Sequence, residues 1–207
     1  MFNKTDVLET INMIEREHLD IRTITMGISL LPCIGATAEV TAQNVYDTVC
    51  RKAKDIVKVA EQLSGEYGIP IVNKRVSVTP VSLISAPFPQ KSGLIGLALD
   101  RAAKELGIDF LGGYSALVHK GTSDYEKIFI EGIPELLAST ERICSSVNIG
   151  SSKSGINMDA VKMMGEVVKQ TAALTADKDG LGCAKLVVFS NAVEDNPFMD
   201  GAFHGVV

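Results

Sequence analysis

The sequence alternates between two hydrophobic periods along its length. Apolar residues recur at helical spacing over 5–17 and then at every second position over 24–30. The same change of period predicts strands at 24–30, 72–78, 110–118, 142–149 and 185–190. Strands that alternate with helices pair in parallel through crossover connections. The sequence therefore predicts an α/β fold of five parallel strands with intervening helices, and the last, nearly continuous apolar strand is expected to be buried on both faces.

Capping and breaking residues predict where the helices begin and end. One long amphipathic helix is expected over 45–63 with a stop at Gly65, and another over 95–106 with a stop at Gly107. Ser123 and Glu126 have capping-box spacing, and Asn157 is expected to cap a later helix. Because no linker-like stretch interrupts the alternation, we expect residues 1–207 to form a single α/β domain.

The charge balance and the apolar runs exclude two classes of partner. Lys and Arg total 20 against 25 Asp and Glu, for a net charge of -5, so no nucleic-acid partner is expected. No apolar run approaches the roughly 20 residues that span a bilayer, and the start has no leader pattern, so we expect no membrane association and a cytoplasmic location. The 4 cysteines lack CxxC spacing and are expected to be free thiols.

In parallel α/β folds, ligands bind beyond the C-terminal ends of the strands, so the loops at those ends hold the candidate residues. Cys33 follows the first strand and is a candidate nucleophile or radical carrier; the alternative is a small apolar residue in a tight turn. Cys183 is a second candidate nucleophile. If the two thiols lie at opposite ends of the fold, they cannot form a redox pair, and we expect them apart. Cys50 and Cys144 are expected to be buried and inert.

The loop after the third strand combines an imidazole and an ammonium just before a helix start. His119 is a candidate catalytic residue there, and Lys120 a candidate for binding an anionic cofactor or substrate. The alternative is that both groups merely face solvent. Ser151 and Ser152 belong to a Gly/Ser/Lys loop that resembles a phosphate cradle in composition, although it does not match the Walker pattern.

The last segment of the chain is rich in ligand-type side chains. Glu194, Asp195 and Asp200 are candidate metal ligands, and His204 is a candidate catalytic residue. The segment matches no known metal signature, and a solvated polar loop is the alternative. Because Asn191 follows the last strand, we expect it to lie near Asn148 at one rim of the sheet. No helix pattern follows this segment, so we expect the chain to be part of a larger fold.

Three segments together resemble the PFL family, also called uncharacterised protein family 0210: KSGLIGLALDRAAKELGIDFLGGYSALVHKG, ERICSSVNIGSSKSGINMDAVKMMGEVVKQTA and DGLGCAKLVVFSNAVEDNPFMDGAFHG. The resemblance implies the α/β barrel of pyruvate formate-lyase-like glycyl radical enzymes, in which two five-stranded half-sheets close a ten-stranded barrel. Family members are about twice this length, so the chain is expected to be the N-terminal half of that barrel. The resemblance also implies a homodimer.

The resemblance does not extend to radical chemistry. Glycyl radical enzymes carry their radical on a glycine in an RVxGY-type loop, and no such motif occurs here; Gly112, Gly113 and Tyr114 lie in a predicted strand. Two functions remain open. The first is an enzyme acting on a small polar molecule at the strand ends, with an unknown cofactor. The second, which the resemblance implies, is a non-catalytic ligand-sensing or regulatory protein, since genes of this family tend to accompany one for a small ACT-domain protein.

Overall fold

The computed structural model describes residues 4–17 and 22–192. Five strands of its sheet run parallel: β1 (Thr23–Ile28), β2 (Asn73–Val78), β3 (Phe110–Leu117), β4 (Ile143–Ser151) and β6 (Leu186–Ser190). The two-residue strand β5 (Gly155–Ile156) turns back antiparallel on the end of β4. The predicted α/β fold with five parallel strands is therefore confirmed.

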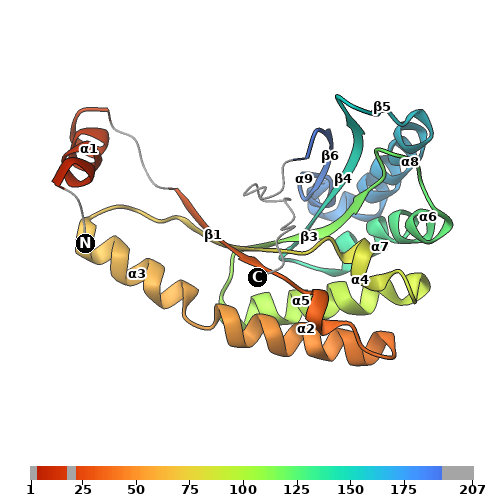
Figure 1. Ribbon diagram of the computed structural model, residues 1–207, viewed down its shortest axis with the longest axis horizontal. Helices are drawn as coiled ribbons and strands as arrows, with labels where there is room; N and C mark the ends of the chain where they lie inside the picture. Colours follow the sequence, from red (N-terminus) through yellow and green to blue (C-terminus); the bar gives the residue numbers. More distant parts are fainter. Residues whose placement is uncertain (1–3, 18–21, 193–207) are drawn as a thin grey trace.

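Helices connect the strands in the order that the sequence predicts (Figure 1). Their bounds are α1 (Lys4–Glu15), α2 (Ala38–Ala53), α3 (Ile56–Tyr67), α4 (Val81–Ser85), α5 (Ser92–Leu106), α6 (Asp124–Glu131), α7 (Ile133–Ser139), α8 (Met158–Leu174) and α9 (Leu181–Ala184). The capping box of Ser123 and Glu126 is present at the start of α6, and Asn157 caps α8 by accepting from the amide of Ala160 at 3.2 Å. None of the described helices is long and apolar enough to cross a bilayer.

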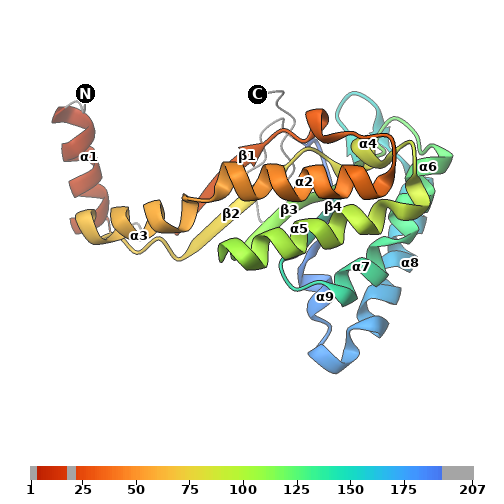
Figure 2. The same cartoon turned by 90° about the horizontal axis from the view of Figure 1, so that it is seen from below.

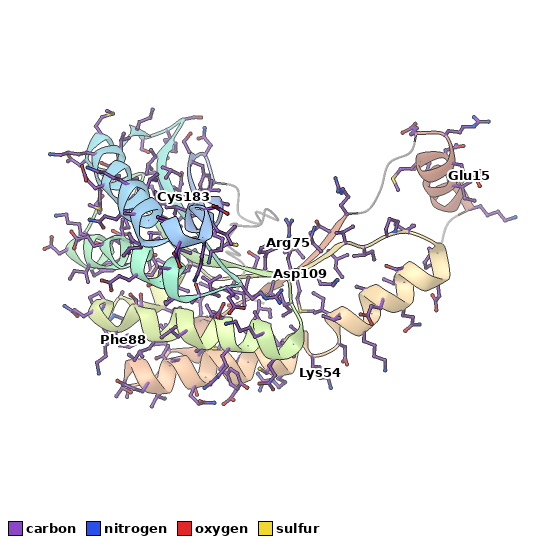
Figure 3. All side chains as sticks on the ribbon, turned by 180° about the vertical axis from the view of Figure 1, so that it is seen from behind. Glu15, Lys54, Arg75, Phe88, Asp109 and Cys183 are labelled. Atoms are coloured by element: carbon purple, nitrogen blue, oxygen red, sulfur yellow. The ribbon has the colours of Figure 1, made fainter. Side chains whose placement is uncertain are left out.

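The single helix expected over 45–63 is in fact two helices. α2 ends at Ala53 and α3 begins at Ile56, with Lys54 at the bend between them (Figure 3). No proline or glycine stands at this bend, and the hydrophobic period continues through it. The sequence therefore contains no signal for the break between the two helices. The expected stop at Gly65 is also wrong, because α3 continues to Tyr67 and ends at Gly68, whose φ of 67° is the left-handed cap conformation.

The sheet is wound in one direction. Its spatial order, β1-β2-β3-β4 with β6 on the far side of β4, follows the chain without reversal. Right-handed crossovers then place the connecting helices on the same face of the sheet. Figure 2 shows α2 and α5 side by side in front of the strands. The core lies between this face and the helices, where the fully buried Tyr114 ring stacks on Phe129 with centroids 4.4 Å apart.

The opposite face of the sheet is more polar. Ser115 and Ser146 are register partners on β3 and β4, and their hydroxyl oxygens lie 2.8 Å apart.

The expectation that the last strand is buried on both faces is wrong: Val187 and Val188 of β6 are 39% and 36% exposed. Among the described strands β6 pairs only with β4, so it is an edge strand of the sheet that these strands form.

Candidate functional site

Four polar residues meet at the edge where β3, β4 and β6 end, and we call them the strand-end cluster: His119, Asn148, Ser152 and Asn191. Parallel strands bring these positions together because all their C-terminal ends lie at one edge. The register pairs Leu117 with Asn148 and Asn148 with Phe189, so the residues that follow these strands are neighbours.

Asn148 holds the imidazole of His119. The terminal amide atom of Asn148 that faces the ring lies 3.3 Å from Nδ1. The amide satisfies both of its ends when its nitrogen donates to the carbonyl oxygens of Gly150 at 2.9 Å and Phe189 at 3.2 Å. Its oxygen then faces Nδ1 of His119 and accepts the Nδ1 proton. This contact favours, in the neutral ring, the tautomer whose Nε2 carries the lone pair.

The same carbonyl of Gly150 joins Asn191 to the cluster. The backbone amide of Asn191 donates to it at 2.9 Å, so Asn148 and Asn191 share one acceptor, and the prediction that these residues lie together is confirmed. Asn191 has a φ of 57°, a left-handed conformation that asparagine tolerates better than most residues. Its Oδ1 accepts from the amide of Ser152 at 2.6 Å and from the Ser152 hydroxyl at 3.1 Å.

The loop that carries His119 is fixed from both sides. Asn157 Nδ2 donates to the carbonyl of Val118 at 2.7 Å and to the hydroxyl of Thr122 at 3.1 Å. At the far end of the loop, the carboxylate of Glu126 accepts from the amide of Ser123 at 2.9 Å. His119 is half-buried within this frame, whereas Lys120 is exposed. Because the capping box already occupies the start of α6, Lys120 rather than the helix start is available to meet an anion.

The Gly/Ser loop around Ser151 forms a tight hairpin rather than an open cradle. The Ser151 hydroxyl accepts from the amide of Ser154 at 3.0 Å, and the amide of Ser152 is bound to Asn191. A phosphate cradle needs backbone amides that point at the ligand, and two amides of this loop already have partners. Ser152 is exposed and Ser151 is half-buried, so their hydroxyls rather than these amides are the groups that a ligand can reach.

Cys33 lies in a second polar region at the same edge, at the end of β1. It ends a 3-10 turn, Leu31–Cys33, is only 3% exposed, and its thiol donates to the hydroxyl of Thr48 on α2 at 3.4 Å. It borders a cavity of about 530 Å³ that Ser29, Pro32, Asn44, Asp47, Thr48, Arg51 and Lys52 also line. The α2 residues of this cavity are not among the candidates predicted from the sequence; their signal is the spacing of Asn44, Thr48 and Lys52 at every fourth position.

The other thiols lie away from this edge or within the core. Cys183 belongs to α9, which precedes β6, and its sulfur lies 3.6 Å from the carbonyl of Val168 on α8 (Figure 3). Cys33 and Cys183 are thus at opposite ends of their strands, as expected. Cys144 is buried as predicted, but Cys50 is only half-buried. Desolvation by its surroundings raises the pKa of the Cys50 thiol, which disfavours the reactive thiolate.

The predicted metal ligands Glu194, Asp195 and Asp200, together with His204, lie outside the described residues. Within residues 4–17 and 22–192, no three His, Cys, Asp or Glu side chains lie close enough together to hold a metal ion. The strand-end cluster consists instead of an imidazole, two amides and a hydroxyl. Such a set can hold a polar molecule by hydrogen bonds and exchange a proton with it through the imidazole.

Comparison with known proteins identifies the family. A family model described as "Uncharacterised ACR (DUF711)" matches residues 12–207. The chain is 60% identical over 202 residues to a UPF0210 protein of Listeria monocytogenes, covering 97% of this chain and 45% of the relative. It is 57% identical over 214 residues to a UPF0210 protein of Desulforamulus reducens, covering 100% of this chain and 46% of that relative. The chain spans about half the length of the curated relatives it matches. It belongs to the DUF711 family of uncharacterised proteins.

Proposed function

We propose that this chain is part of an enzyme that acts on a small polar molecule at the strand-end cluster, with His119 as the group that takes up or gives the proton. The observation that carries the proposal is the contact of Asn148 with Nδ1 of His119 at 3.3 Å. A general base needs a fixed ring and a free lone pair, and a hydrogen bond from Nδ1 supplies both by leaving Nε2 unprotonated.

The surroundings of His119 favour a polar substrate. The members of the cluster are hydrogen-bonding groups, while Lys120 and Lys153 stand exposed in the two adjoining loops. Hydroxyl and amide groups orient a substrate through hydrogen bonds, and the two ammonium groups attract anionic molecules to this edge. We therefore expect the substrate to carry hydroxyl, carbonyl or anionic groups rather than a large apolar surface.

A substrate screen tests the proposal. The purified chain is incubated with a mixture of cellular metabolites, and compounds that bind or disappear are identified by mass spectrometry. The comparison includes His119→Gln and, as a control, Lys127→Gln on the following helix α6, whose side chain is exposed. Turnover that depends on His119 supports the enzyme. If no compound is consumed and none binds at this edge, the proposal is wrong.

The second candidate function is non-catalytic sensing of a small ligand. The cavity beside Cys33 favours it, because that cavity has binding groups but no imidazole among its lining residues. In the same screen, a compound that binds and is recovered unchanged would favour the sensor over the enzyme.

We also propose that the five parallel strands are half of a ten-stranded barrel of the pyruvate formate-lyase type. One-directional winding supports this, because it gathers the connecting helices on one face and leaves the other for a second half-sheet. The relatives' greater length is compatible with that second half.

The homodimer and the cytoplasmic location are proposals as well. Sedimentation of a full-length relative would test the dimer, and a fluorescent fusion the location.

A further inference from the structure

The cavity beside Cys33 lies between the end of β1 and one face of α2. Its volume of about 530 Å³ falls within the range of small-molecule sites in proteins. Its walls come from the strand end and the 3-10 turn on one side and from successive turns of α2 on the other: Ser29, Pro32, Cys33, Asn44, Asp47, Thr48, Arg51 and Lys52. The cavity is separate from the residues of the strand-end cluster.

The hydroxyl of Ser29 is the first sign of a ligand. Ser29 is 3% exposed, and its Oγ has no hydrogen-bond partner among the residues that the structure describes. A buried hydroxyl without a partner destabilises the fold, because it loses its hydrogen bonds to water and gains none in return. Because this side chain lines the cavity, a molecule in the cavity can supply the missing partner.

The hydrogen-bond pattern of Thr48 indicates which kind of partner fits. Its oxygen accepts the proton of the Cys33 thiol at 3.4 Å, so the hydroxyl's own hydrogen remains available as a donor. The turn is held in place because Asn44 Nδ2 donates to the carbonyl of Cys33 at 3.1 Å. Ser29 and Thr48 therefore both offer hydroxyl donors to the cavity, and a ligand that uses both must supply acceptors.

The charges of the lining also favour an anion. Arg51 and Lys52 contribute two cations, and neither forms an ion pair with any side chain in the described ranges. Asp47 is the one carboxylate among the lining residues, and its Oδ1 accepts from Gln43 at 2.9 Å. The lining side chains therefore carry a net charge of one positive unit. The guanidinium of Arg51 also has the geometry that pairs with two oxygens of one ligand group.

We propose that this cavity is a binding site for a small anion whose carboxylate or phosphate group is held by the hydroxyls of Ser29 and Thr48 and by Arg51. Ser29 supplies the buried donor, Arg51 neutralises the charge, and Lys52 attracts the anion to the opening. The site goes beyond the proposed proton chemistry at His119 and does not depend on it.

Isothermal titration calorimetry of the 207-residue chain tests the site. The probes are inorganic phosphate and succinate, each titrated at a constant ionic strength of about 0.15 M so that general screening stays fixed. The variants are Ser29→Ala, Arg51→Gln and, as a charge-matched control, Lys58→Gln, which removes an exposed cation of α3 outside the cavity. The variant His119→Gln shows whether anion binding in this cavity is independent of the residue on which the proposed enzymatic function depends.

The expected result is saturable binding of at least one probe, weakened about tenfold or more by Ser29→Ala and by Arg51→Gln. Lys58→Gln and His119→Gln should leave the affinity unchanged. Binding of phosphate alone or of succinate alone would each support the site and identify its preferred anion. The absence of saturable binding of either probe would overturn the proposal, as would equal weakening by Lys58→Gln, which indicates general charge attraction.

Melting temperatures of the ligand-free variants show whether the Ser29 hydroxyl serves ligand binding or stabilises the folded protein. Ser29→Ala removes a hydroxyl that has no described partner, so the free protein should melt at the same temperature or higher. If Ser29→Ala lowers the melting temperature and binding is unaffected, the hydroxyl has a structural partner and the proposal is wrong.

Discussion

The side-chain amide of Asn148 lies 3.3 Å from Nδ1 of His119, across the pair of strands β3 and β4. Because the amide nitrogen of Asn148 is engaged by the carbonyls of Gly150 and Phe189, its oxygen is left to receive the ring proton. The backbone pairing of the sheet therefore places Asn148 where its amide oxygen favours the tautomer of His119 whose Nε2 carries the lone pair. This relationship is what makes the strand-end cluster suited to proton transfer.

The tautomer of His119 can be measured directly. We expect ¹⁵N NMR of the neutral ring to show a protonated Nδ1 and a bare Nε2, since Asn148 accepts from Nδ1. In Asn148→Ala the acceptor is lost, and the two tautomers should become mixed. A ring that is protonated at Nε2 in the unmodified protein would contradict this geometry. Comparison with His119→Gln assigns the signal among the 3 histidines.

Asp100 is expected to be important for stability. This carboxylate is 5% exposed and accepts from the amides of Glu141 at 3.0 Å and Arg142 at 2.7 Å, which fastens α5 to the start of β4. Asp100→Ala should lower the free energy of unfolding by about 2 to 4 kcal/mol, because two amides lose a charged acceptor. Urea unfolding provides the measurement, with Glu131→Ala as the exposed control; equal effects of the two changes would refute the role.

Gly113 should tolerate no side chain. Its φ is 118°, and a Cβ there would lie 2.5 Å from Cγ2 and 2.6 Å from the carbonyl oxygen of Val78. Gly113→Ala should therefore destabilise the fold by about 3 kcal/mol or more. At Gly165 on α8, a Cβ would meet no atom within 4 Å outside its own helical turn, so Gly165→Ala should stabilise by about 0.5 to 1 kcal/mol. Similar melting temperatures for the two variants would contradict this packing.

Lys185 should make stability depend on pH in the alkaline range. It is 5% exposed and donates to the carbonyls of Leu137 at 2.9 Å and Thr140 at 2.6 Å at the end of α7. Burial lowers the pKa of this lysine below its ordinary value of 10.5. Between the folded and unfolded pKa values the unfolded chain binds more protons, so this residue's contribution to stability rises with pH in that window.

The variant Lys185→Met isolates that contribution. It should lower the free energy of unfolding at neutral pH by about 1 to 3 kcal/mol, because two carbonyls lose their donor. It should also remove the rise in the free energy of unfolding that the unmodified protein shows as the pH approaches 10.5 from below. Urea unfolding at several pH values would detect this change. Parallel pH curves for the two proteins would show that Lys185 is not the group responsible.

Local signals in the sequence predicted local structure well. The capping box of Ser123 and Glu126 and the cap at Asn157 depend on residues three positions apart, and both are confirmed. The bend at Lys54 was missed because no residue there breaks a helix. The exposure of β6 was missed because an apolar run reports hydrophobicity but not which strands lie beside it.

The candidate site was predictable only where topology alone brings residues together. Parallel pairing was enough to place Asn148 near Asn191, and it also brought His119 to the same edge. The cavity beside Cys33 could be predicted only in part: the spacing of Asn44, Thr48 and Lys52 marks one face of α2, but the contact of this face with the end of β1 arises in the tertiary structure. That contact joins Ser29 to Arg51 through tertiary structure, and neither residue has a distinguishing pattern in the sequence.

The proton-transfer role of His119 is tested by the turnover rate of a screened compound by the unmodified chain, by His119→Gln and by Lys127→Gln. General acid–base groups contribute about 100-fold to 10,000-fold to a rate. If His119 transfers the proton, the rate should fall by at least about 100-fold in His119→Gln and stay unchanged in Lys127→Gln. Equal rates for His119→Gln and the unmodified chain would contradict this role.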